Sequence, residues 1–126
     1  MKISHLDHLV LTVSDINNSI EFYTKVLGFD LVIFNDRKAL KFGNQKINLH
    51  QKGNEFEPKA EKPTTGSADL CFIAETKIED ILTELKQQDI KIIEGIVERT
   101  GASGKIKSIY FRDPDLNLIE VSNYIN

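Results

Sequence analysis

Strand-like and helix-like patterns of apolar residues alternate along the first half of the chain in the order β-α-β-β-β. The predicted strands cover residues 6–13, 29–34, 38–42 and 45–51, and the predicted helix covers residues 16–27. Ser14 and Asp15 are residue types that cap a helix N-terminus, and Gly28 suits the left-handed residue that ends one.

The second half repeats this order after a stretch rich in proline, glycine and charge at residues 53–67, which we interpret as a linker. Thr76 is the predicted cap of a helix whose apolar face carries Ile78, Ile81, Leu82 and Leu85. The predicted strands are residues 69–74, 90–93, 106–112 and 117–123, with a loop or hairpin tip at residues 98–105.

The repeat predicts an α+β protein made of two β-α-β-β-β modules. The modules are expected to form a curved mixed sheet, as two half-barrels with their helices on the convex side. They cover about residues 4–52 and 68–124 of a single domain, 1–126, because each module alone is too small to bury a core. Aligning the halves places His8 over Asp69 and His50 over Glu120.

In each of four strands a wholly apolar face alternates with a face that carries a polar or ionisable residue. The mixed faces place four side chains that can bind metal on one side: His8, His50, Asp69 and Glu120. Buried charge is costly unless it is paired or bound to metal, so two imidazoles and two carboxylates together favour a divalent cation such as Zn, Ni, Mn or Fe. The alternatives are hydrogen-bonded core histidines, Asp69 as a turn cap, and Glu120 paired with Arg112.

Composition narrows the possible partners. The chain has 126 residues, a formal net charge of −3 and scattered basic residues, which argues against binding to nucleic acid or an anionic membrane. No apolar run is long enough to span a membrane, the N-terminus has no signal core, and Cys71 is the only cysteine, so we expect a cytoplasmic protein. A small-molecule substrate remains, with Arg99 in the ERTGASG loop and Asn48 on the face of His50 as predicted contacts.

The motifs DHLVLTVSDINNSIEFYTKVLGF and YFRDPDLNLIEVSNY, with the paired modules, resemble the vicinal oxygen chelate superfamily. This superfamily includes glyoxalases, bleomycin-resistance proteins and extradiol dioxygenases, and the chain is most similar to its small bacterial glyoxalase-domain proteins, some of them virulence-associated. The resemblance implies metal binding by His8 and Glu120 and a substrate contact by Tyr110. Asp69 stands where the family's metalloenzymes usually have histidine, and His50 is the candidate replacement.

Together these observations predict a metal-dependent lyase or isomerase of glyoxalase type, acting as a homodimer on a small oxygen-rich substrate. The metal would bind adjacent substrate oxygens and stabilise an enediolate, while Glu120 or Asp69 moves the proton and Tyr110 assists. One alternative is a metal-free binding or resistance protein of the bleomycin-binding type. Another is an extradiol-type dioxygenase that holds iron(II) through His8, His50 and Glu120.

Overall fold

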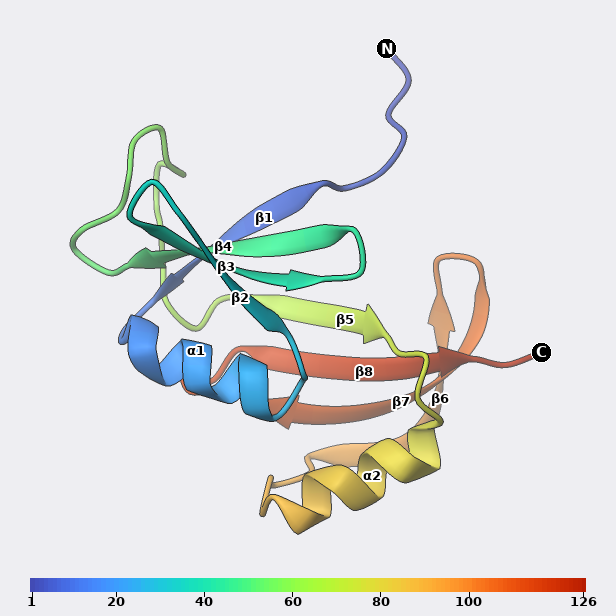
Figure 1. Cartoon of the computed structure of the whole chain (residues 1–126). Coiled ribbons are helices and arrows are strands. Elements are labelled where there is room, and N and C mark those ends of the chain that lie inside the picture. The colour runs from blue at the N-terminus through green and yellow to red at the C-terminus, as the bar shows by residue number, and fades with distance from the viewer. The chain divides into compact units, whose positions relative to one another are not determined.

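The computed structural model describes all 126 residues, which form two compact units, Met1–Gly66 and Ser67–Asn126. Each unit has the order β-α-β-β-β, so the predicted repeat is confirmed (Figure 1). The first unit contains β1 (His8–Val13), α1 (Ile16–Lys25), β2 (Asp30–Phe34), β3 (Arg37–Phe42) and β4 (Gln45–Gln51). The second contains β5 (Asp69–Ile73), α2 (Ile78–Gln87), β6 (Glu94–Gly101), β7 (Gly104–Arg112) and β8 (Leu118–Tyr124). Neither helix has the length and apolar character that crossing a membrane would require.

The mixed sheet expected from the repeat is divided into two four-stranded sheets, one in each unit. In the first unit the strand order is β1-β4-β3-β2, with β1 parallel to β4 and the other neighbours antiparallel. The helix α1 covers one face of this sheet, where Tyr23 is fully buried and stacks on Phe29 at 5.8 Å between ring centroids (Figure 1). The opposite face of the sheet carries His8, Asn48 and His50.

Side chains at both ends of α1 explain where it begins and ends. Asp15 caps the N-terminus as predicted, because its Oδ1 accepts a hydrogen bond from the Asn18 amide at 3.1 Å. Gln51 at the end of β4 accepts from the Ile16 amide at 2.9 Å, which links the helix start to the sheet. Gly28 follows the helix with φ +70°, the left-handed conformation that glycine adopts without strain.

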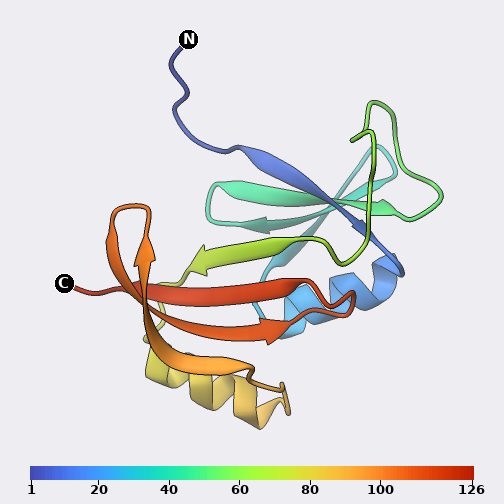
Figure 2. The same cartoon turned by 180° about the vertical axis from the view of Figure 1, so that it is seen from behind.

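In the second unit the strand order is β5-β8-β7-β6, with β5 parallel to β8 (Figure 2). The helix α2 packs on β7 and β8 through one apolar face, on which Ile78, Ile81 and Leu85 are buried. The other face of this sheet carries the ionisable residues of β5 and β8, as the alternation predicts.

Two local predictions in the second half are wrong, and a third, the hairpin tip at residues 98–105, is correct in kind but too long. Residues 90–93 are not a strand, because the Ile90 amide closes the end of α2 by donating to Leu85 at 3.0 Å. The strand β6 starts at Glu94 and includes the first half of the predicted loop 98–105, so only the tip between β6 and β7 lacks strand structure. Thr76 does not cap α2; instead, the Oδ1 of Asn123 accepts from the Ile78 amide at 2.6 Å.

The strand registers also correct the alignment of the two halves. Val10 pairs with Asn48 in the first unit, and the equivalent Cys71 pairs with Glu120 in the second, so Asn48 is the counterpart of Glu120. By the same rule His50 corresponds to Ser122, not to Glu120. Apolar alternation does not detect this error, because a shift of two residues leaves each side chain on the same face of its strand.

Candidate functional site

The strands of the second unit line a pocket of about 420 Å³ on the face opposite α2. Its walls are apolar and aromatic, with a thiol, a carboxylate and a guanidinium among them. This mixture of apolar walls and a few polar groups is typical of small-molecule sites. The lining residues are Cys71, Ile73, Arg99, Ile106, Tyr110, Glu120 and Tyr124, with residues 100–102 of the β6–β7 hairpin.

Glu120 is the most extensively hydrogen-bonded residue of this pocket, which we call the Glu120 pocket. Its Oε2 accepts from the Ser108 hydroxyl at 2.5 Å and from the Ser122 hydroxyl at 3.4 Å. The two serines are fully buried and lie 2.7 Å apart between their hydroxyl oxygens. No lysine, arginine or histidine forms a salt bridge with Glu120. The carboxyl group is therefore held in place by neutral donors and has no cationic partner.

Tyr110 is the direct cross-strand neighbour of Glu120, and its hydroxyl interacts with that carboxylate. Burial raises the pKa of the Tyr110 hydroxyl, and its hydrogen bond to Glu120 raises it further. The phenol therefore stays protonated at neutral pH and can act as a hydrogen-bond donor in the pocket.

Arg99 extends over Tyr110, with its guanidinium carbon 5.5 Å from the centre of the ring. Its Nη2 lies 3.2 Å from Oε1 of Glu94. Hydrogen bonding to Tyr110 raises the pKa of Arg99, with a further contribution from Glu94. The structure thus brings together three residues predicted from sequence, Glu120, Tyr110 and Arg99.

Cys71 lies on β5 beside Glu120, with its Sγ 3.5 Å from the Ser122 hydroxyl. Burial is the main cause that raises the pKa of this thiol, and the neighbouring charge of Glu120 acts in the same direction. The thiol is therefore protonated and a weak nucleophile at neutral pH. Asp69 is two residues earlier on the same face of β5 and is exposed.

The first unit holds the other predicted residues. His8 lies at the start of β1 with its side chain 44% exposed, and its Nδ1 is 2.8 Å from the Asp7 carboxylate. Asn48, the counterpart of Glu120, has a buried Oδ1 with no hydrogen-bond partner. These two residues share one face of the sheet.

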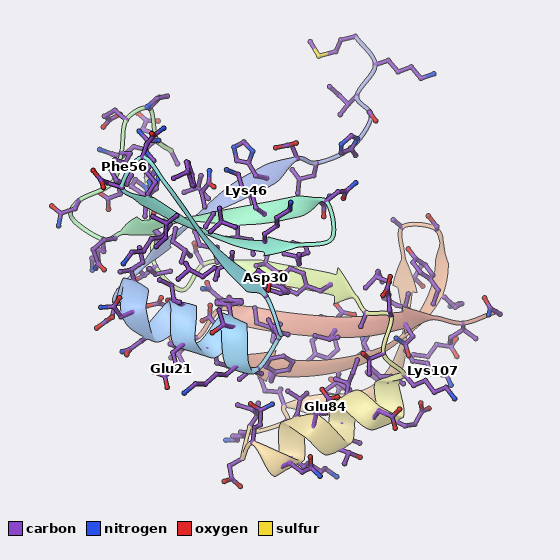
Figure 3. The ribbon with its side chains drawn as sticks, viewed as in Figure 1. Glu21, Asp30, Lys46, Phe56, Glu84 and Lys107 are labelled. Carbon is purple, nitrogen blue, oxygen red and sulfur yellow. The ribbon has the colours of Figure 1, made fainter.

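His50 is buried at the opposite end of that face, with its ring 5.5 Å from that of Phe56. Phe56 lies in the loop after β4 (Figure 3). Arg37 lies over the same Phe56 ring, with its guanidinium carbon 4.3 Å from the ring centre. Burial lowers the pKa of His50, and the charge of Arg37 lowers it further. Four register positions separate His8 from His50, or about 13 Å along the strands, so one unit does not bring these imidazoles together.

No three His, Cys, Asp or Glu side chains gather closely enough to hold a metal ion. Two residues of the Glu120 network had no predicted role: Ser108 and Ser122. Ser122 follows Glu120 by two residues on β8 and therefore shares its strand face. This spacing places Ser122 near the carboxylate but does not indicate the hydrogen bond. Ser108 is found only from the β7–β8 register, which pairs it with Ser122.

Two β-α-β-β-β units with open curved sheets and a polar pocket on the sheet face define a glyoxalase-like fold. The model of the Glyoxalase/Bleomycin resistance protein/Dioxygenase superfamily matches residues 5–121, and the chain belongs to this superfamily. The resemblance stated from the sequence motifs is therefore confirmed. Members of the superfamily bind small molecules and often form dimers.

Relatives cover nearly the whole chain. Virulence protein STM3117 of Salmonella typhimurium is 64% identical over 99% of this chain and 88% of its own length. Its crystal structure matches with a TM-score of 0.98, at 63% identity over 99% of this chain and 100% of that one. Glyoxalase domain-containing protein RDO1 of Mycosarcoma maydis is 55% identical, covering 98% and 70% of the two chains. Metallothiol transferase FosB of Staphylococcus epidermidis is 33% identical, covering 96% and 82%.

Proposed function

We propose that the chain is a divalent-metal-dependent enzyme of glyoxalase type, a lyase or isomerase whose small oxygen-rich substrate binds in the Glu120 pocket. The observation that carries this proposal is the state of Glu120, a partly buried carboxylate fixed by Ser108 and Ser122 and lacking a cationic partner. Burial of such a charge is costly without a cation. Superfamily members that include FosB use divalent metals, which supports a cation at this position.

Carboxylate and imidazole are donor types that zinc, nickel, manganese and iron accept, although no three such side chains are gathered in this structure. A carboxylate anchored through one oxygen by a hydroxyl is the usual arrangement of a metal ligand and its outer partner. His8 has a similar outer partner, because its Nδ1 is 2.8 Å from the Asp7 carboxylate, which leaves Nε2 as the ring nitrogen available to a cation. Glu120 is the ligand best supported, and His8, Asp69 and His50 are the other proposed ligands. His8 and His50 lie too far apart in one unit to bind the same ion, so only one of these two imidazoles would join it.

A bound divalent cation would supply Lewis-acid chemistry by polarising a substrate oxygen. Tyr110 keeps its proton at neutral pH and would donate a hydrogen bond to oxygen as negative charge develops there. Arg99 lies 5.5 Å from the Tyr110 ring centre, and Ile73 and Ile106 add apolar surface to the wall of the pocket. Glu120 is the proposed group that moves the substrate proton.

The metal content of protein purified without chelator tests this proposal. Wild type should retain a divalent metal and lose thermal stability when a chelator removes it. His8→Ala and Glu120→Gln should each lose the metal, and Asp69→Ala and His50→Ala test the remaining ligands separately. His5→Ala is the matched control, because His5 is an exposed histidine that contacts only Ser4 in the N-terminal segment.

The proposal of a metalloenzyme would be ruled out if purified wild type contained no metal and bound neither Zn²⁺ nor Mn²⁺ on titration. A small-molecule binding protein of the bleomycin-binding type is then the alternative, and its ligands would raise the melting temperature of the metal-free protein. The predicted homodimer is a separate proposal, which light scattering of the purified chain checks.

A further inference from the structure

Arg99 is the one positively charged residue that lines the Glu120 pocket. Three contacts fix its guanidinium: Nη2 faces Glu94 at 3.2 Å, the group lies over the Tyr110 ring, and Nη1 donates to the Glu98 carbonyl at 2.9 Å. The side chain remains 41% exposed, so a ligand in the pocket can reach it. The structure thus holds a cation in place at the wall of a cavity.

These contacts do not explain Arg99 as a purely structural residue. Both partners of the Arg99–Glu94 pair are exposed, and such pairs contribute little to stability. A guanidinium has five N–H donors in a planar fork, of which the contacts to Glu94 and Glu98 use only part. The fork matches two oxygens of one carboxylate, which it binds through two parallel hydrogen bonds.

Tyr110 connects Arg99 with Glu120. Adjacent strands place Glu94, Tyr110 and Glu120 in one row across β6, β7 and β8. The Tyr110 ring lies 5.5 Å from the Arg99 guanidinium carbon, and Tyr110 pairs directly with Glu120 across β7 and β8. A positive group and a proposed cation-binding group are therefore both neighbours of one tyrosine in the pocket.

We propose that Arg99 binds the carboxylate of the substrate, and that the substrates are small acids in which a carboxylate adjoins a carbonyl or hydroxyl oxygen. The adjoining oxygen would face the cation at Glu120, and this half of the assignment rests on the proposed function. Ile73 and Ile106 leave room in the 420 Å³ pocket for a short apolar substituent. A 2-oxo or 2-hydroxy acid carries both oxygen groups on neighbouring carbons.

Binding of acetate to the chelator-treated full-length chain tests the role of Arg99 without any metal. Acetate should bind and raise the melting temperature, whereas acetamide, its neutral analogue, should not. Arg99→Gln should weaken acetate binding by about tenfold or more, and Arg99→Lys should weaken it less. Arg112→Gln is the matched control, because Arg112 lies on β7 of the same unit outside this pocket. Equal acetate affinity in wild type and Arg99→Gln would overturn the proposal.

A second titration separates this inference from the proposed function. With Mn²⁺ present, pyruvate should bind wild type more tightly than acetate, and Glu120→Gln should lose that advantage while still binding acetate. If Mn²⁺ has no effect on wild type, the metalloenzyme is overturned and the role of Arg99 stands on the acetate result. If Mn²⁺ binds but Arg99→Gln leaves pyruvate affinity unchanged, the role of Arg99 is overturned and the metalloenzyme stands.

Discussion

The same row of four strand positions is chemically different in the two units. In the first unit it reads Val32, Ala39, Asn48 and Val10 across β2, β3, β4 and β1. In the second unit the equivalent positions read Glu94, Tyr110, Glu120 and Cys71 across β6, β7, β8 and β5. The topology is shared, but β6 and β7 are longer than β2 and β3 and a bulge between Gly95 and Val97 shifts their register, so the units differ in backbone there as well as in side chains.

This difference shows what the repeat determines and what it leaves to individual residues. The repeat places the four residues of this row on the open face of each sheet. Only in the second unit do they include groups that line a pocket with polar chemistry. Asn48 stands where Glu120 does, and its buried Oδ1 lacks the hydroxyl donors that Ser108 and Ser122 give to Glu120. A site therefore needs the neighbours of a ligand as well as the ligand.

The largest predicted effect is a loss of metal affinity when the row of the second unit is made to resemble that of the first. Glu120→Asn copies the residue of the first unit and should lower the affinity for Zn²⁺ or Mn²⁺ by about a hundredfold, because an amide lacks the carboxylate charge. Competitive metal titration measures this. Asn48→Gln in the first unit is the control and should keep the metal affinity of wild type. An unchanged affinity in Glu120→Asn would place the metal elsewhere.

Removing the Ser108 hydroxyl tests whether the hydrogen-bond partners of Glu120 contribute to stability and to metal binding. Ser108→Ala should lower the free energy of unfolding by about 1–3 kcal/mol, because the Glu120 carboxylate loses a donor and the buried Ser122 hydroxyl loses a hydrogen-bond partner. Metal affinity should also fall by about tenfold. Urea unfolding and metal titration measure the two effects. Ser103→Ala at the exposed hairpin tip is the control, and an equal loss in both variants would contradict the role of Ser108.

Local sequence patterns were sufficient to predict most of the fold. Cap and turn residues such as Asp15 and Gly28 act within a few positions of the chain, so their effect can be read from the sequence. The start of α2 could not be predicted in this way, since its partner is Asn123, which is 45 positions further along the chain. The limits of β6 depend on pairing with β7, which is likewise a tertiary contact.

The candidate site was only partly predictable, for a related reason. Alternation places Glu120 and Asp69 on open sheet faces, because face is a property of each strand alone. Tyr110 was predicted only from the family resemblance. Register is a property of two strands, so the pairing of Ser108 with Ser122 was not accessible, and His50 was aligned two positions away from its true counterpart. The contact between Phe56 and His50 could not be predicted either, because Phe56 lies in an irregular loop where the sequence has no periodic pattern.

Replacing the unbonded amide of Asn48 should stabilise the first unit. Asn48→Leu removes a buried polar oxygen while keeping the branched heavy-atom skeleton of the side chain, and it should raise the free energy of unfolding by about 1 kcal/mol. Asn48→Asp, which puts charge in the same place, should lower it. Chemical denaturation of both variants measures the difference. A loss of stability in Asn48→Leu would mean that the amide oxygen has a partner in solution.

Two residues with nearly the same positive φ give opposite predictions. Gly28 in the first unit has φ +70° and Leu116 in the second has φ +69°. Leu116→Gly should raise the free energy of unfolding by up to about 1 kcal/mol, because the side chain is strained there and is 67% exposed. Gly28→Ala should lower it by about the same amount, since the space is open and only strain acts. Thermal unfolding checks both signs, and a loss in Leu116→Gly would show that this leucine makes a stabilising contact.

The smallest predicted effect is a pH dependence that belongs to the first unit, because its residue His50 corresponds to the non-titrating Ser122. Burial, reinforced by the charges of Arg37 and Lys59 and opposed by Glu55, lowers the pKa of folded His50 below its ordinary value. Between the lowered pKa and about 6.5 the unfolded chain binds more protons, so stability falls as the pH drops through this window and is fully present above it.

Urea unfolding at several pH values between about 5 and 7.5 measures this slope. The variant His50→Ser copies the second unit and should show a shallower loss of stability toward low pH than wild type. Arg37→Gln should also reduce the loss, because it removes one of the charges that oppose protonation of the imidazole. Identical slopes in wild type and His50→Ser would show that the buried imidazole beneath Phe56 does not control the acid sensitivity of the chain.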